Sequence, residues 1–177
     1  MFIRLWIAMN LLLLAGCSSA TTTQVTSEHD ASVEFNKYKT FAWHPQGMTS
    51  TGIPAQRAAA AQTIIREVVE QELARSGYKH ATYATPDFFI VTTIGAVNLT
   101  KVRKWGTAEG GFTQTATQVP VQAEQMREGS IVIDFIDNKT SQLLWRGLAH
   151  GAINPEKDMR PQVEGPVRAM MAKFPPK

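Results

Sequence analysis

Two stretches of the chain carry apolar residues at the spacing of an amphipathic helix. The first stripe comprises Ala61, Ile65, Val68, Val69 and Leu73. Pro54 lies near its start and Gly77 follows its end, which is the asymmetry that helix termini favour. The second stripe comprises Val163, Val167, Met170, Met171 and Phe174. Because Pro166 interrupts this stripe early, we expect the second helix to begin at Pro166 and to end before Pro175.

The remaining apolar stretches are short and either alternate or run continuously, which predicts β-strands. The predicted strands are residues 38–43, 88–94, 130–136 and 142–149. The last two form a hairpin, because the turn-forming segment 137–140 joins them. Pro45 and Gly47 predict a loop after the first strand. The pattern weakens over residues 98–128, where Pro120 places any extended ribbon at an edge of the sheet.

This order of elements predicts one α+β domain, with a single largely antiparallel sheet and both helices packed on one face. The chain has 177 residues, of which 44% are hydrophobic, and a domain of that size buries enough surface to fold without disulfides. We expect this domain to span residues 32–177. Residues 17–31 begin with small polar side chains that cannot bury apolar surface, so we expect a flexible tether there.

Composition and charge exclude several classes of protein. Charged residues make up 19% of the chain, and the net charge of +3 with no long basic run argues against binding to nucleic acid. A single cysteine excludes a disulfide scaffold. Only one long apolar run is present, at the N-terminus, which excludes a polytopic membrane protein.

That N-terminal run predicts a signal peptide over residues 1–16. Arg4 precedes about a dozen mostly apolar residues, too few to span a bilayer core of about 30 Å. The run ends in Leu14-Ala15-Gly16-Cys17, and Cys17 is the only cysteine in the chain. A buried N-terminal helix, or an ordinary signal peptide with an incidental cysteine, would also fit the run.

The segment from Leu14 to Cys17 resembles the lipobox of bacterial lipoproteins. The resemblance implies cleavage after Gly16, attachment of a diacylglycerol to the Cys17 thiol, and acylation of the new amino group. Two or three chains on one residue make a stable membrane anchor, whereas one chain binds only marginally. Ser18, in place of Asp, implies sorting to the outer membrane of a Gram-negative envelope, and we expect the domain to face the periplasm.

Six short segments of the mature chain, taken in order, form a distinctive set: residues 35–43 (Phe-x-x-Tyr-Lys-Thr-Phe-Ala-Trp), 72–78, 86–88, 127–134, 144–147 and 173–177. In these segments the chain resembles a family of uncharacterised bacterial lipoproteins that carry a DUF4136-type domain. The resemblance implies an α/β domain on an envelope lipoprotein and no known activity. This chain departs from the family over its central loop, where Thr and Gln replace Gly, Tyr and Trp.

No arrangement of residues predicts catalysis, a metal site or a cofactor, so we expect a protein that is not an enzyme. The four histidines do not pair at metal-binding spacings, and the cluster Glu28-His29-Asp30 fits a solvated end of the tether as well as a ligand set. Asp134 in an apolar strand is either a carboxylate in a cleft or a structural residue, on the solvent face of its strand or paired with Arg146 across the hairpin. Trp43 and Trp145 fit the core or a ligand site.

One cluster is a candidate contact surface. Lys101, Arg103 and Lys104 place three positive charges beside Trp105. The cluster would suit an anionic membrane surface, and it equally suits a solvated loop tip.

We therefore expect a non-catalytic interaction or structural module, held to the membrane by its lipid anchor. The alternative is an accessory lipoprotein subunit of an envelope transport or assembly machine, which would bind an envelope protein by strand addition.

Overall fold

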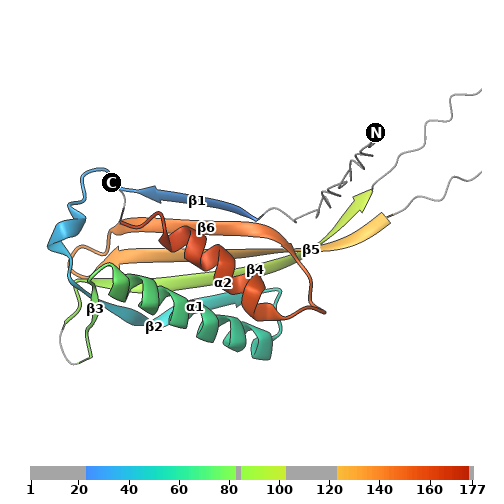
Figure 1. Ribbon diagram of the computed structural model, residues 1–177, viewed down its shortest axis with the longest axis horizontal. Coiled ribbons are helices and arrows are strands. Elements are labelled where there is room, and N and C mark those ends of the chain that lie inside the picture. Colours follow the sequence, from blue (N-terminus) through green and yellow to red (C-terminus); the bar gives the residue numbers. More distant parts are fainter. Residues whose placement is uncertain (1–22, 83–84, 103–122, 176–177) are drawn as a thin grey trace, which may run out of the picture.

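The computed structural model describes residues 23–82, 85–102 and 123–175, and these form one mixed sheet with both helices on one face (Figure 1). The expected α+β architecture is confirmed. The strand order across the sheet is β1-β6-β5-β4-β2-β3. The strands are β1 (Gln24–His29), β2 (Thr40–Thr51), β3 (Lys79–His80), β4 (Phe88–Val102), β5 (Ala123–Asp137) and β6 (Leu143–Ile153). The helices are the 3-10 turn η1 (Phe35–Lys37), α1 (Ala55–Arg75) and α2 (Met159–Met171).

The connections explain why the sheet is mixed. β4 and β5 are antiparallel, as are β5 and β6, which the turn after Asp137 joins, and β1 is antiparallel to β6. The first long helix, α1, leads back from the end of β2, so β3 and β4 pair with β2 in parallel. Within the described ranges, neither helix is long and apolar enough to cross a membrane.

The domain begins earlier than the sequence indicates. Residues 24–29, expected to be tether, form β1 and pair with β6 from Gln24↔His150 to His29↔Trp145. Of these residues only Val25 is apolar, and it packs against the core. An edge strand of this kind is held mainly by its backbone hydrogen bonds, so its side chains carry little of the alternation that predicts a strand. The predicted start at residue 32 is wrong.

The second helix also begins earlier than expected. It starts at Met159, where the Asp158 carboxylate caps it by accepting a hydrogen bond of 3.0 Å from the Arg160 N–H. Pro166 lies inside the helix rather than at its start. A proline disfavours helical backbone for the preceding residue by clashing with that residue's N–H and Cβ, and Gly165 has no Cβ. The sequence Gly165-Pro166 is therefore compatible with a continuous helix.

The first long strand continues through the segment expected to be a loop. β2 runs to Thr51, and its pairing with β4 shifts register between Trp43 and Met48. Pro45 and Gly47 lie in this irregularity, where the ladder does not need the missing proline N–H.

The core lies between the helices and the sheet, and its aromatic part gathers where both helices end. Phe174, just after α2, is the centre of this cluster. Its ring centroid lies 4.7 Å from that of Phe135, 5.5 Å from that of Trp145 and 5.5 Å from that of Tyr78. The expected burial of Ile65 and Val68 is confirmed, with exposed fractions of 0% and 1%.

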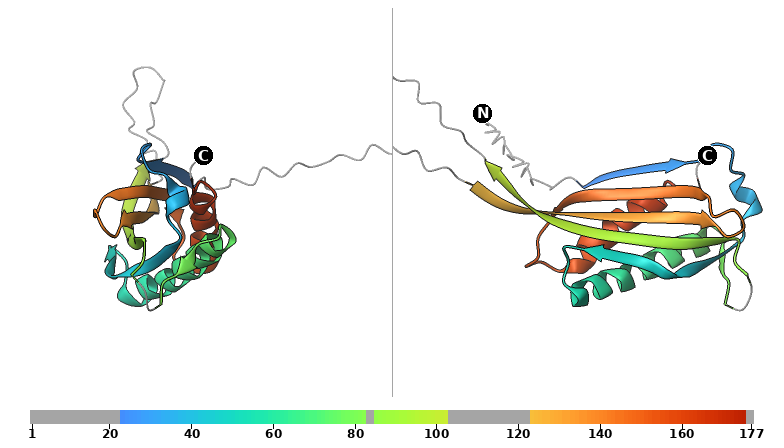
Figure 2. Two further views of the ribbon diagram at one scale, coloured as in Figure 1. Left: turned by 90° about the vertical axis from the view of Figure 1, so that its left-hand side faces the viewer. Right: turned by 180° about the vertical axis from the view of Figure 1, so that it is seen from behind.

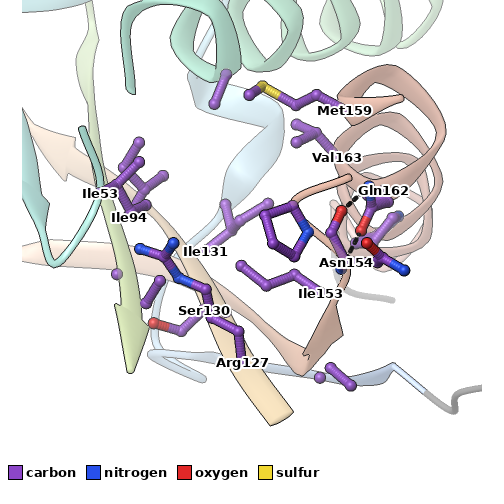
Figure 3. A pocket seen from close by; sticks show the side chains of 18 of the residues that line it. Ile53, Ile94, Arg127, Ser130, Ile131, Ile153, Asn154, Met159, Gln162 and Val163 are labelled. Carbon is purple, nitrogen blue, oxygen red and sulfur yellow. Dashed lines mark hydrogen bonds between the residues drawn. The ribbon is translucent and has the colours of Figure 1, made fainter. Parts of the chain in front are cut away.

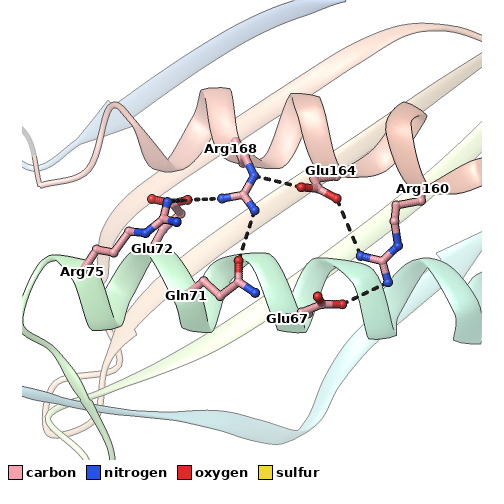
Figure 4. A network of polar contacts seen from close by, with 7 residues as sticks. All are labelled: Glu67, Gln71, Glu72, Arg75, Arg160, Glu164 and Arg168. Carbon is pink, nitrogen blue, oxygen red and sulfur yellow. Dashed lines mark hydrogen bonds and ion pairs between the residues drawn. The ribbon is translucent and has the colours of Figure 1, made fainter.

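An ion-pair seam joins the two helices along their outer sides (Figure 4). Arg160, at the start of α2, lies 3.1 Å from Glu67, just past the middle of α1, and Arg168 bonds Glu72 and Gln71 near the helix ends. Glu164 bridges the two arginines from within α2. The later arginine of α2 pairs with the later glutamate of α1, so the partners follow in the same order along the two helices. α1 and α2 therefore run parallel, and both begin at the same end of the sheet.

The close approach of Trp145 to its own strand gives a first prediction. A Cβ built on Gly147 would lie 2.5 Å from Cη2 and 3.1 Å from Cζ3 of the Trp145 indole. Gly147→Ala should therefore lower the free energy of unfolding by about 1–3 kcal/mol in urea denaturation. Phenylalanine lacks those two atoms, so the same change should cost clearly less in a Trp145→Phe background. Strictly additive costs of the two substitutions would show that the indole does not cover Gly147.

Candidate binding pocket

A pocket of about 720 Å³ opens at the end of the molecule where both helices begin. Its walls come from the starts of α1 and α2, the connection 154–158, and the adjoining parts of β4, β5 and β6 (Figure 3). The volume lies within the range of roughly 300–1,000 Å³ typical of small-molecule sites. It is the candidate site that the geometry supports.

Along β5, the side chains that face the helices change from aromatic to charged in the direction of the pocket. Alternate residues of a strand share one face, and here they are Phe135, Ile133, Ile131, Gly129 and Arg127. Phe135 and Ile133 are fully buried in the core, whereas the last three line the pocket. The strand thus leads from the aromatic cluster, through an aliphatic floor, to a guanidinium.

Small residues keep this end of the core open. The first turns of α1 place Ala58 and Ala61 toward the core, and the strands contribute Ala96, Gly129 and Gly151. As a result Ile53, Ile131 and Met159 pack against the core but remain half-buried. Their exposed portions form the apolar lining, which Ile94, Ile153 and Val163 complete.

Positive charge surrounds this apolar lining. Arg57, Arg127 and Lys157 all line the pocket, and no aspartate or glutamate is among its described lining residues. The guanidinium of Arg127 lies beside Ile94 and donates to the carbonyl oxygen of Gly52, while its Nε is buried without a hydrogen-bond partner in the described part of the chain (Figure 3). Two helix starts add the positive ends of their dipoles.

Hydrogen bonds brace the rim of the pocket. The Arg57 guanidinium donates to the Pro155 carbonyl oxygen at 3.1 Å, which ties α1 to the connection before α2. Across that connection, the Asn154 N–H donates to the Gln162 side chain at 2.7 Å, and the Gln162 amide donates to the Asn154 carbonyl at 3.0 Å. At the turn into α1, Gly52 has φ +69°, and a Cβ there would lie 2.1 Å from the Ala96 carbonyl oxygen. The rim therefore depends on this glycine.

The structure does not describe the side chains that the sequence singled out as site residues. Cys17, Arg103, Lys104 and Trp105 lie outside the described residues, and of Lys101 only the backbone is described, within β4. No cluster of His, Cys, Asp and Glu in the described ranges could hold a metal ion.

For the other candidate residues, the contacts in the structure decide between the alternatives that the sequence left open. Asp134 pairs with Arg146 across the hairpin, with distances of 2.6 Å and 2.8 Å, as one of the two interpretations predicted. The cluster Glu28-His29-Asp30 does not converge, because Glu28 approaches Arg146 at 3.9 Å while Asp30 accepts hydrogen bonds from Ser32. Trp145 is fully buried, and half-buried Trp43 donates to Glu70 at 2.7 Å beneath Arg66.

Sequence reasoning missed the pocket because its residues come from five segments that are far apart in the chain. One signal was available along β5, where the alternate positions from Phe135 to Arg127 change from aromatic to aliphatic to glycine to cation. A strand buried along its whole helix-facing side would not end in that series.

The pocket predicts unequal costs for two isoleucines on the same face of β5. Ile133 is fully buried, whereas Ile131 is half-buried at the pocket. Ile133→Ala should cost about 2–5 kcal/mol of unfolding free energy, and Ile131→Ala should cost less than about 2 kcal/mol, because water or a ligand already replaces part of its packing. Urea denaturation of both variants tests this, and equal large costs would mean that the core is closed at Ile131.

Comparisons with known proteins place the fold. A PDZ domain protein from Parabacteroides distasonis has a TM-score of 0.54 at 19% identity, covering 89% of this chain and 37% of that one. This chain therefore spans little more than a third of that protein, and the likeness shows a shared fold only. The PelC dodecamer from Paraburkholderia phytofirmans has a TM-score of 0.48 at 6% identity, covering 85% and 96% of the two chains.

A neuraminyllactose-binding hemagglutinin homolog from Helicobacter pylori has a TM-score of 0.46 at 9% identity, covering 78% and 83%. No curated protein matches the chain. A family model, the domain of unknown function DUF4136, matches residues 25–176, which include β1 and every later element. The chain therefore belongs to the DUF4136 family.

Proposed function

We propose that this protein is a bacterial envelope lipoprotein, anchored through Cys17, whose domain is a non-catalytic binding module. The observation that carries the binding role is the pocket of about 720 Å³, which has an apolar floor and a braced rim. The anchor is supported by Leu14-Ala15-Gly16-Cys17 after an apolar run, with no other cysteine in the chain. Ser18 supports an outer-membrane location with the domain in the periplasm.

The proposed anchor and the pocket are close in the chain. Thr23 lines the pocket, and Cys17 precedes it by six positions. Even a fully extended chain spans at most about 20 Å over that length. A lipid-anchored protein would therefore hold its pocket near the membrane surface.

A second candidate function is that of an accessory subunit in an envelope transport or assembly machine. Its support is a projecting arm: beyond the pair Arg127↔Ile153, strands β4 and β5 continue together without β6 (Figure 2). Both edges of this arm lack a neighbouring strand among the described residues, and such an edge can accept a strand from a partner.

The anchor is tested by changing Cys17 to Ser. The serine hydroxyl is a much weaker nucleophile than a thiol, so Cys17→Ser should abolish incorporation of an alkyne-labelled fatty acid and leave an uncleaved precursor. Ser19→Ala changes a nearby hydroxyl and should label normally. Labelling of Cys17→Ser equal to that of the parent would contradict the lipoprotein proposal.

A further inference from the structure

We propose that the pocket binds an anionic amphiphile, a single hydrocarbon chain with a phosphate or carboxylate head, drawn from the membrane beside the anchor. The inference rests on the proposed function and names the ligand class of its pocket. It follows from three features of the pocket: an apolar floor, a positively charged mouth, and a place near Cys17.

The floor suits a hydrocarbon chain. Ile53, Ile131 and Met159 expose apolar surface that no described side chain covers, and Ile153 and Val163 extend it. Burying such surface against a flexible chain stabilises the complex by about 25 cal/mol for each Å² removed from water. The grading along β5 sets the orientation, because the chain would point toward Ile133 and the head toward Arg127.

The mouth suits an anionic head. Arg57, Arg127 and Lys157 lie on three sides of it, from α1, β5 and the connection before α2. The first turn of α1 has no side-chain cap, since Pro54 occupies the N-cap position, so its N–H groups add to the positive potential. Asp158 lies nearby, but its carboxylate caps α2. Among the described residues, the Arg127 guanidinium donates only from one amino group, to the Gly52 carbonyl, so it retains a donor that a phosphate or carboxylate can satisfy.

Proximity favours the membrane as the source. The mature N-terminus reaches at most about 20 Å from Thr23 at the pocket wall. Amphiphiles in the leaflet that holds the anchor would therefore be the nearest molecules of this chemistry.

The test is binding of three probes to the chain from Ser18 onward, which contains every element that the structure describes. The probes are dodecyl phosphate, dodecyltrimethylammonium and inorganic phosphate, each below its micelle concentration. Calorimetry and native mass spectrometry should show one dodecyl phosphate per chain, at least about tenfold weaker binding of dodecyltrimethylammonium, and no detectable binding of inorganic phosphate. Equal affinity for the two detergents would overturn the inference.

Four variants locate the binding. Arg127→Gln should weaken dodecyl phosphate binding by about tenfold or more, and Lys173→Gln, which removes an exposed cation at the opposite end, should not change it. A Cβ on Gly129 would lie 2.8 Å from Cγ2 of Ile153, the branch methyl next to its Cβ, so valine at position 129 must turn the Ile153 side chain as well as add its own methyl groups to the pocket. Gly129→Val should therefore block binding of the hydrocarbon chain, at some cost in melting temperature. The triple change of Lys101, Arg103 and Lys104 to Gln should leave binding intact. Loss in the triple variant, or none in Gly129→Val, would place the site elsewhere.

Two further outcomes separate this inference from the proposal on which it rests. If the chain binds none of the probes while Cys17 is lipidated in cells, the ligand class is wrong and the lipoprotein proposal stands. If the lipidated full chain fails to bind dodecyl phosphate that the unlipidated chain binds, the protein's own acyl chain occupies the pocket, and the inference of a separate ligand is overturned.

Discussion

The packing of Phe174 joins the parts of this fold that would otherwise be independent. Its ring contacts Phe135 and Trp145 on neighbouring strands, Tyr78 after α1, and Phe35 in η1, and it belongs itself to the segment after α2. Aromatic pairs at these separations stabilise the fold beyond the stabilisation that comes from burying their apolar area. Both helices are therefore held to the sheet most firmly at their C-terminal ends.

The parallel course of α1 and α2 turns this uneven packing into a site. The aromatic cluster lies where both helices end, whereas the small core-facing residues Ala58, Ala61, Gly129 and Gly151 lie where both helices begin. The same end gathers two helix dipoles and the cations Arg57, Arg127 and Lys157. The cavity and its positive charge thus share one cause, the direction of the helices, which the ion pairs Arg160–Glu67 and Arg168–Glu72 maintain.

The sequence predicts those helices and strands in which the burial of each side chain determines the pattern of apolar and polar residues. The stripe from Ala61 to Leu73 and the run from residue 88 to 94 identify α1 and β4, because a helix facing a core and a central strand must both bury apolar side chains. The edge strand β1 and the first turns of α2 were missed for the opposite reason. Backbone pairing holds β1, so that strand leaves no hydrophobic period. The period of α2 already includes Val163, but Pro166 indicated a later start, and Gly165 offsets the effect of that proline.

Sequence patterns could not predict the pocket, because its position depends on which ends of α1 and α2 lie next to each other. The alternating residues from Phe135 to Arg127 become informative only after the helices are placed over β5. By contrast, the pair Asp134–Arg146 could be anticipated from the hairpin alone, since a two-residue period brings the two side chains onto one face of adjacent strands.

The most direct test of the account is the accessibility of isoleucine methyl groups to a water-soluble paramagnetic agent, measured by NMR relaxation. The account predicts strong relaxation enhancement at Ile131 and Ile153, which line the open end, and little at Ile65, Ile90 and Ile133, which are fully buried. Equal protection of Ile131 and Ile133 would show that the helix layer closes over both ends of the sheet and would contradict the account.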